Sequence, residues 1–318
     1  MRKRSRVLAV LCAATVFMGL AMGSGSSSDI DKEIVSAETK TEEKDPGMEL
    51  ASTGEKTTEE DANASEENQP ENSITVDEIV LLDQNDIKIT ATGMEDGFMG
   101  TELKVLIENN GSKSVTVQTR NSCVNGYMVE TMISSEVAAG KKVNDSIVFY
   151  TSELKDCGID TFATMEFSFH IFDSETWDTV LDSENIVVNT SAAATYVQEY
   201  DDSGDVIFEQ DGIKIVAKGV SSKDSIFGPG LILYIENNSD KNITVQARDT
   251  SVNGFMIDTV MSDDIIVGKK AITALTFFSS SLEENGIDKI EDMEFILHIF
   301  DMDTWNTIVD TDVISLTF

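Results

Sequence analysis

The chain is poor in cysteine, histidine, proline and basic residues, and these shortages exclude several classes of protein. Its 318 residues include three cysteines, two histidines and three prolines. Three cysteines are too few for a disulfide-framed scaffold, and two histidines leave little room for a histidine-rich zinc site. Only 23 Lys and Arg stand against 58 Asp and Glu, a formal net charge of −35. Nucleic acids and anionic membrane surfaces would repel such a chain.

The N-terminus has the pattern of a secretory signal. A basic start, MRKRSR, is followed by the apolar run VLAVLCAATVFMGLAM, which is short for a membrane span of roughly 20 residues. The junction Ala21-Met22-Gly23-Ser24 is similar to that of Gram-positive lipoproteins, but Ser24 has no thiol to acylate. We expect cleavage after Gly23 and an extracellular or cell-surface location. The protein is membrane-tethered if residues 1–23 are retained or if position 24 is natively a lipidated cysteine.

Residues 24–75 predict a disordered acidic stalk. They contain 15 acidic and 4 basic residues and almost no large apolar ones. Such a segment cannot bury enough apolar surface to offset its ordering entropy, and self-repulsion extends it.

The remainder is an internal duplication. The tripeptides ENN, VNG and GKK and the tetrapeptide HIFD each return 128 residues later, and residues 103–182 and 231–310 share 36 identities in 80 positions without a gap. Each copy has the size of a domain. The predicted organisation is a signal segment (1–23), a stalk (24–75), repeat 1 (76–190), a connector (191–201) and repeat 2 (202–318).

Within each copy the hydrophobic period is two, which is typical of strands. Apolar and polar residues alternate through 165–171 and through 115–120, and turn clusters separate the runs. One helical turn is expected at 280–285, with a capping box from Ser280 to Glu283 and Gly286 at its end. The pattern predicts an all-β fold of two tandem immunoglobulin-like antiparallel β-sandwiches. A jelly-roll sandwich is the alternative.

The repeats also resemble a known family. The shared features are a strand ending in IENN, a following Lys113, the alternating strand SVTVQ, the CVNG or SVNG turn and the GKK turn. They are similar to those of telokin-like, immunoglobulin-type domains of unknown function on exported Gram-positive lipoproteins. The resemblance covers both repeats and implies an extracytoplasmic sandwich without established catalysis.

Each repeat has an acidic hairpin tip, FDSETWD in the first and FDMDTWN in the second. Alternating carboxylates in a flexible loop can wrap calcium, with Asp173 and Glu175 or Asp301 and Asp303 as ligands. The central glycine and the distant bidentate Glu of a calcium-binding hand are missing. The favoured interpretation is an Asx turn in which Asp173 and Asp301 bond the backbone.

Four aromatic residues occur at matching positions of the two repeats. Trp177 and Trp305 begin the strand after the acidic tip, and Tyr127 and Phe255 follow the Asn-Gly steps. Exposed aromatics at a sandwich edge can stack on sugars or anchor a protein partner. For the tryptophans, closure of the core is the favoured interpretation.

The two cysteines outside the signal segment both lie in repeat 1. Cys123 and Cys157 correspond to Ser251 and Asn285 in repeat 2. The absence of both cysteines from repeat 2 suits a disulfide in an oxidising compartment. Two independent buried thiols fit as well.

No catalytic residues are predicted. His170 and His298 occupy one position per repeat, and a half-exposed strand histidine is expected there rather than a zinc ligand. The sequence contains no G-x-S-x-G, glycine-rich phosphate loop, H-E-x-x-H or C-x-x-C motif, and acidic residues are too frequent to single out a glycosidase pair.

The sequence therefore predicts an exported bacterial surface protein that is not an enzyme and needs no cofactor. Two sandwich modules on a stalk would bind an unknown surface protein or glycan, or act as spacers. The alternative is a calcium- or glycan-binding accessory module that uses the acidic and tryptophan-bearing tips. A hydrolase with a carboxylate-lined cleft between the repeats ranks last. Neither ligand nor oligomeric state follows from the sequence.

Overall fold

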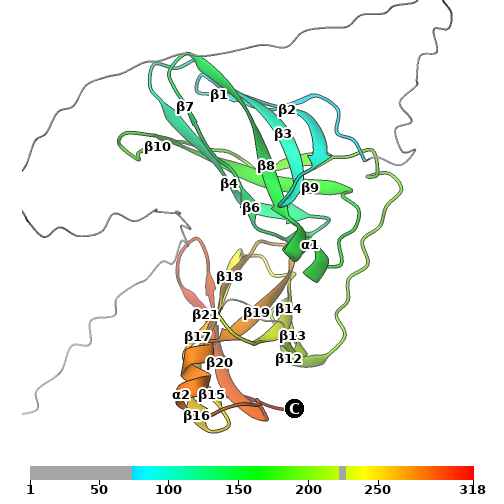
Figure 1. The fold of residues 1–318 in the computed structure, drawn as a ribbon, viewed down its shortest axis with the longest axis vertical. Coiled ribbons are helices and arrows are strands. Elements are labelled where there is room, and N and C mark those ends of the chain that lie inside the picture. Colours follow the sequence, from blue (N-terminus) through cyan, green and yellow to red (C-terminus); the bar gives the residue numbers. More distant parts are fainter. Residues whose placement is uncertain (1–73, 222–226) are drawn as a thin grey trace, which may run out of the picture. The chain divides into compact units, whose positions relative to one another are not determined.

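Antiparallel strands make up nearly all the regular structure of the computed structural model, which describes residues 74–221 and 227–318 (Figure 1). The predicted signal segment and nearly all of the predicted stalk lie outside these residues. The all-β prediction is confirmed.

Repeat 1 forms two sheets, and the chain crosses several times from one sheet to the other between strands. The first sheet has the order β1 (Ile79–Gln84), β2 (Ile87–Asp96), β3 (Gly100–Asn109), β8 (Lys141–Tyr150), β6 (Thr131–Met132). The second contains β10 (Thr179–Asp182), β9 (Thr164–Asp173), β4 (Val115–Val124) and β5 (Tyr127–Met128), with β11 (Ile186–Asn189) on β9 and β7 (Ser134–Val137) on β4. The helix α1 (Thr151–Asp156) follows β8.

Repeat 2 reproduces this pairing strand for strand. Its first set is β12 (Asp205–Gln210), β13 (Ile213–Ser221), β14 (Gly230–Asn237), β19 (Lys270–Phe277) and β17 (Thr259–Val260). Its second set is β21 (Thr307–Asp310), β20 (Asp292–Asp301), β15 (Ile243–Val252), β16 (Phe255–Met256), β18 (Ser262–Ile265) and β22 (Ile314–Thr317). The helix α2 (Ser279–Glu284) follows β19.

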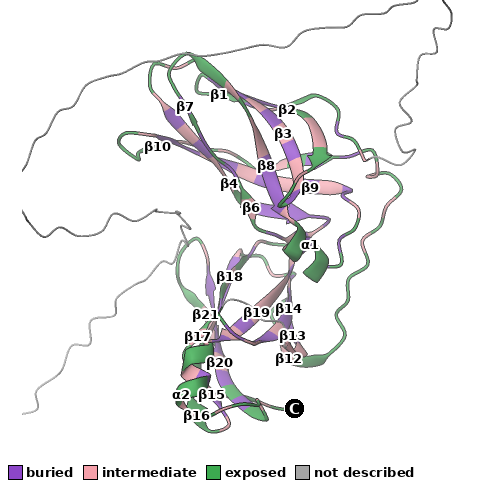
Figure 2. Ribbon diagram, in the orientation of Figure 1, coloured by how far each residue is buried: buried purple, intermediate pink, exposed green. Residues whose placement is uncertain are grey.

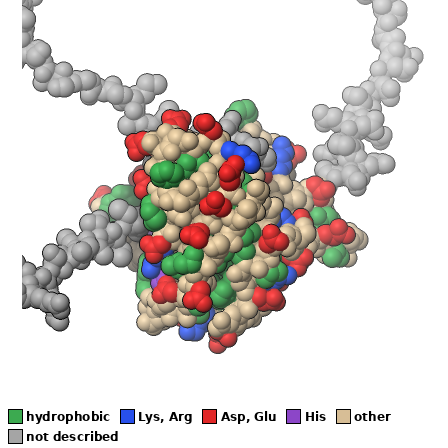
Figure 3. All heavy atoms as spheres, turned by 90° about the horizontal axis from the view of Figure 1, so that it is seen from below, with side chains coloured by type: hydrophobic (Ala, Val, Ile, Leu, Met, Phe, Trp, Pro, Cys, Tyr) green, Lys and Arg blue, Asp and Glu red, His purple; other side chains and the backbone are tan. Residues whose placement is uncertain are grey.

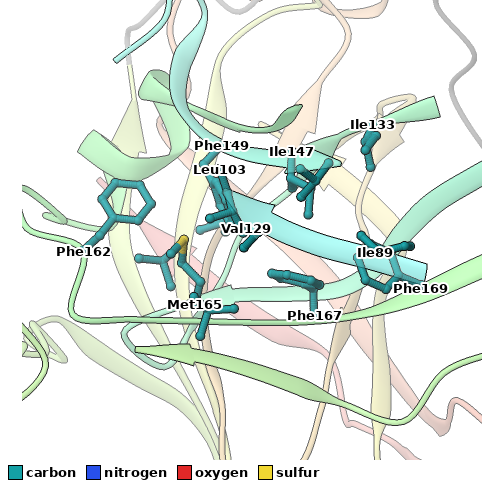
Figure 4. Close-up of a cluster of buried hydrophobic side chains, with 14 of the residues drawn as sticks. Ile89, Leu103, Val129, Ile133, Ile147, Phe149, Phe162, Met165, Phe167 and Phe169 are labelled. Atoms are coloured by element: carbon teal, nitrogen blue, oxygen red, sulfur yellow. The ribbon is translucent and has the colours of Figure 1, made fainter. Parts of the chain in front are cut away.

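The core of repeat 1 lies between its two sheets, as expected for a sandwich (Figure 4). Ile89 and Leu103 come from β2 and β3, whereas Phe167 and Phe169 come from β9, and all four are buried. A corresponding cluster, including Leu233 and Phe295, lies in repeat 2. Buried and exposed residues alternate along these strands (Figure 2), so one face of each sheet points inward and the other outward.

The ENN motif is explained by a buried asparagine. The Nδ2 group of Asn109 donates to the carbonyl oxygens of Lys113 and Val137, both at 2.8 Å, and its Oδ1 accepts from the N–H of Gly111 at 2.9 Å. Asn237 bonds the equivalent groups of repeat 2. This asparagine ties one turn to a distant strand, which explains its recurrence.

The VNG motif has a similar explanation. Asn125 and Asn253 both have φ of +50°, and each side chain bonds the backbone of a segment more than 30 residues away. The Oδ1 atom of Asn125 accepts from the N–H of Ala163 at 2.9 Å, and that of Asn253 accepts from the N–H of Glu291 at 2.9 Å. The turn identities between the repeats are therefore folding requirements.

The predicted helical turn is present, but its predicted start is wrong. The N-cap of α2 is Phe278, which makes no side-chain capping bond, so Ser280 lies inside the helix. The C-terminal prediction is confirmed, because Gly286 has φ of +66° and donates to the carbonyl of Glu283.

Candidate functional site

The hairpin tip between β9 and β10 is an Asx turn, as the sequence indicated. Asp173 Oδ1 accepts from the N–H groups of Glu175 and Thr176, at 3.0 and 3.2 Å, and Oδ2 pairs with Lys113 Nζ at 2.7 Å. The bond from Lys113 is the main cause that lowers the pKa of Asp173. In repeat 2, Asp301 makes the same turn with Asp303 and Thr304.

This geometry does not support the calcium alternative. The oxygens of Asp173 are engaged by the turn and by the lysine, while Glu175 and Asp303 are exposed beyond it. Within residues 74–221 and 227–318, no three His, Cys, Asp or Glu side chains converge as a metal site would require.

The prediction that the tryptophans close the core is wrong. The exposed fractions of Trp177 and Trp305 are 69% and 67%. Their φ angles of +65° and +61° are left-handed, and each N–H donates to the carbonyl of the Asp that begins the turn, Asp173 or Asp301. The tryptophan therefore closes the turn at the tip, beyond the region where the two sheets enclose the core.

Each tryptophan lies against a phenylalanine on the outer face of the sheet. The ring centroids of Phe172 and Trp177 are 5.3 Å apart with an interplanar angle of 14°, and the His170 ring centroid lies 5.4 Å from that of Phe172. Repeat 2 has the same arrangement, with 5.6 Å from Phe300 to Trp305 and 5.2 Å to His298. An ordered row of three aromatic rings results in each repeat.

The histidines are held by carboxylates. The Nδ1 atoms of His170 and His298 lie 2.5 Å from Oδ1 of Asp182 and Asp310, respectively. The side chains are only 12% and 10% exposed. They are more covered than the half-exposed histidine that the sequence predicted, because the neighbouring phenylalanine and aspartate enclose them.

Around this row, eight outer-facing residues are the same in both repeats, whereas Ser168 and Glu136 on the same face become Ile296 and Asp264. We call this surface the aromatic face. Its members in repeat 1 are Thr116, Gln118, Arg120, Ser134, His170, Phe172, Trp177 and Asp182. Those in repeat 2 are Thr244, Gln246, Arg248, Ser262, His298, Phe300, Trp305 and Asp310. These eight pairs are identical, while the inward-facing residues of β4 and β9 differ at Val115, Thr119 and Phe169.

One row of the opposite sheet has changed, and in repeat 2 this row is buried, with Val216 and Tyr234 0% and 1% exposed. The cross-strand row Thr90, Leu106, Asn144 becomes Val216, Tyr234, Ile272 in repeat 2. Only the row Lys88, Glu108, Lys142 is retained there, as Lys214, Glu236, Lys270. The change to Val216, Tyr234 and Ile272 accompanies the packing of this row against the buried cluster of repeat 1.

The structure separates the other two predicted aromatics. Tyr127 is 1% exposed and Phe255 is 49% exposed. Tyr200 of the connector covers Tyr127, with ring centroids 5.3 Å apart, and its hydroxyl donates to the carbonyl of Asn125 at 2.8 Å. Burial raises the pKa of Tyr127 to about 12. Tyr127 is therefore not available to a ligand.

Repeat 2 contributes to the same contact. The N–H of Lys270 donates to the carbonyl of Gly126 at 3.0 Å, and Lys270 Nζ lies 4.2 Å from the Tyr200 ring centroid. Tyr234 also belongs to the buried cluster of repeat 1. Residues of both repeats therefore lie in one buried cluster.

Cys123 and Cys157 are free, buried thiols in the structure, so the disulfide alternative is not formed there. Burial raises the pKa of each to about 12, which keeps both in the poorly nucleophilic thiol form. Cys123 Sγ lies 3.2 Å from Sδ of Met128.

A cavity of about 260 Å³ lies elsewhere in repeat 2. It is lined mainly by Val220, Pro229, Leu282, Ile287 and Ile290, and contains none of the predicted site residues. Ile290 stands where repeat 1 has Phe162, whose ring packs edge-on against Phe149.

Sequence reasoning missed Glu153 in α1, whose Oε2 accepts from the N–H of Glu130. Burial, the largest cause, raises its pKa to about 7 from 4.5. In repeat 2, the hydroxyl of Ser281 accepts from the N–H of Asp258 at the equivalent position. Comparison of the two repeats could have identified Glu153, since the equivalent residue in repeat 2 is the neutral Ser281.

We expect Glu153→Gln to stabilise the protein at pH 8 and to change little at pH 4.5. A carboxyl whose folded pKa is raised favours folding below its unfolded pKa, and this contribution disappears as pH rises through about 7. The variant should gain about 1–2 kcal/mol at pH 8. Urea unfolding at both pH values measures this, with Ser281→Ala as the control. An equal effect at the two pH values would contradict the assignment.

Comparison with known proteins identifies no family. No family model and no curated protein match the chain. Solved structures that resemble it include the YadV chaperone, at 11% identity over 73% of this chain and 100% of the other, with a TM-score of 0.22. The Salmonella enterica SafA pilin in complex with the SafB chaperone gives 11% identity over 68% and 89%, with a TM-score of 0.20.

A third similar structure is CBD12 from CALX1.2, at 12% identity over 62% of this chain and 72% of that chain, with a TM-score of 0.16. Scores this low carry no argument about activity. The immunoglobulin-like sandwich class agrees with the observed sheets. The resemblance to telokin-like lipoprotein domains stays a prediction.

Two further observations concern the surface charge and the helices. Acidic side chains are spread over the face seen in Figure 3, with few basic ones between them. In the part of the chain that the structure describes, no helix has the length and apolar character to cross a membrane.

Proposed function

We propose that this chain is an exported, non-catalytic binding protein whose two repeats present the same ligand-binding face. The basic and apolar N-terminal segment supports export, and the acidic residues 24–75 suit a stalk. The aromatic face, centred on Trp177 and on Trp305, is the binding surface.

The observation that carries this proposal is the identity of the aromatic face in the two repeats. The ENN and VNG identities follow from hydrogen bonds that hold the fold together. Outer-facing Gln118 and Arg120 pack no core, yet both are retained as Gln246 and Arg248. A shared ligand accounts for this retention.

The conformation of the tryptophans is a second support. A left-handed residue at the end of a turn is ordinarily Gly or Asn, and a bulky side chain costs about 1 kcal/mol or more there. Both repeats accept this cost and leave about two thirds of a large apolar side chain in water. Strain retained in duplicate at an exposed aromatic favours binding over a spacer role.

Two equal faces on one chain would act together on a repetitive surface. Once the first face is bound, the second binds at a raised local concentration, so avidity exceeds the affinity of either face by roughly 10²–10⁴-fold. The duplication is useful for a ligand that is displayed many times.

The proposal is tested with full-length protein and isolated Gram-positive cell walls. We expect the protein to sediment with the walls, Trp177→Ala or Trp305→Ala to reduce retention at least tenfold, and the double variant to remain in solution. Phe255→Ala, which removes an exposed aromatic outside the aromatic face, is the matched control. Retention of the double variant at the wild-type level, or no retention of the wild type, would overturn the proposal.

A further inference from the structure

We infer that the ligand of the aromatic face is a β-linked carbohydrate chain of pyranose rings with equatorial hydroxyl groups. This inference rests on the proposed binding function and names the chemical class of its ligand. Three features of the tip support it: a single open aromatic surface, a hydrogen-bonding pair and tolerance of a charge change.

Each tip offers one rigid indole surface to a ligand. Phe172 is 6% exposed and lies against Trp177, so it supports the indole from one side. His170 supports Phe172 in turn and is fixed by its bond to Asp182. A pyranose ring with equatorial hydroxyl groups has a flat surface of C–H bonds, and an immobilised indole binds such a surface with little loss of side-chain entropy.

A pair of polar groups lies beside each indole. In repeat 1, the hydroxyl of Thr176 donates to Oδ2 of Asp178 at 2.8 Å. In repeat 2, Nδ2 of Asn306 donates to the hydroxyl of Thr304 at 3.1 Å. All four residues are exposed, so the pair can also bond hydroxyl groups at the rim of a stacked sugar.

The change from Asp178 to Asn306 distinguishes a sugar from a cationic peptide. An amide and a carboxylate both bond hydroxyl groups, whereas a lysine or arginine would lose its ion-pair partner in repeat 2. This position of the tip keeps a hydrogen-bonding group and not its charge, while the nearby carboxylates of Glu175 and Asp303 are exposed in both repeats. A neutral, hydroxyl-rich ligand fits both repeats.

Further neutral groups continue along the sheet from the tip. Nε2 of Gln118 donates to the hydroxyl of Ser134 at 3.3 Å, and Gln246 and Ser262 do the same at 3.1 Å. Planar amides and hydroxyls next to an aromatic surface are the groups that fix orientation in such sites. Because they follow the sheet, they match an extended β-linked chain better than a coiled α-linked one.

The chain reports on these sites directly, because Trp177 and Trp305 are its only tryptophans. Full-length protein is titrated with cellohexaose, chitohexaose and maltohexaose, and with a pentalysine peptide, while indole fluorescence is followed. We expect a saturable change with cellohexaose or chitohexaose and none with the other two probes. Trp177→Ala and Trp305→Ala isolate each site, and both should still respond.

The outcomes separate this inference from the proposed function. The absence of a fluorescence change with every sugar, or an equal change with α-linked maltohexaose, overturns the β-linked carbohydrate. A response to pentalysine alone assigns a cationic ligand instead. If cell-wall retention requires both tryptophans but is abolished by protease treatment of the walls, the binding function stands and the carbohydrate inference fails. Retention of the protein on protease-treated walls supports the carbohydrate.

Discussion

Replacing Tyr127 by alanine should destabilise the protein by about 3–5 kcal/mol, whereas Phe255→Ala should cost about 1 kcal/mol or less. The two residues are equivalent in the duplication, yet Tyr127 is 1% exposed and Phe255 is 49% exposed. The tyrosine fills a space closed by Tyr200, and its removal leaves a cavity. Urea unfolding of the full chain measures both free energies.

Comparing Tyr127→Ala with Phe255→Ala makes this a stringent test. Both variants remove an aromatic ring from the same position of the same fold, so differences in strand propensity cancel. An equal cost at the two positions would mean that Tyr200 and repeat 2 do not cover Tyr127 in solution. Tyr200→Ala should reproduce part of the Tyr127→Ala effect, because the ring contact at 5.3 Å is lost in both.

Asn109→Ala should cost about 3 kcal/mol, the second large effect. The side chain is 1% exposed and makes three hydrogen bonds to backbone groups. Each bond contributes about 1 kcal/mol, and the buried carbonyl of Val137 loses its side-chain donor. Asn237→Ala should cost a similar amount in repeat 2, where the same bonds occur.

The neighbouring asparagine provides the control. Asn110 is the exposed third residue of the ENN motif, and Asn110→Ala should change the free energy of unfolding by no more than about 0.5 kcal/mol. Asn109→Asp tests the direction of the bonds, since the carboxylate keeps the acceptor for Gly111 but loses both donors. Full stability of Asn109→Asp would contradict the role of the amide.

The hydrophobic period of two correctly predicted the sandwich, because alternation along a strand follows directly from backbone geometry. The Asx turn at Asp173 was likewise predictable, since it needs only one side chain and the next three residues. Local rules were sufficient where the partners are close in sequence. The start of α2 at Ser279 is an exception, because its N-cap Phe278 makes no side-chain capping bond.

Burial of the aromatics was not predictable in the same way. Trp177 was expected in the core because tryptophan is usually buried, but the closing position of the turn points it outside the region between the sheets. Tyr127 and Phe255 share a sequence context and differ in exposure because only one of them meets the connector and repeat 2. Such contacts join residues more than 70 positions apart.

The sequence by itself determined the duplication, the β period, the turn chemistry and the excess of negative charge, since each depends on composition or on spacing within a few residues. The tertiary structure decided which aromatics face water, that Cys123 and Cys157 are buried thiols, and that residues from β4, β7, β9 and β10 form one outer surface. The physical reason is that strand pairing brings together residues that are distant in the chain, and a sequence pattern does not specify those partners.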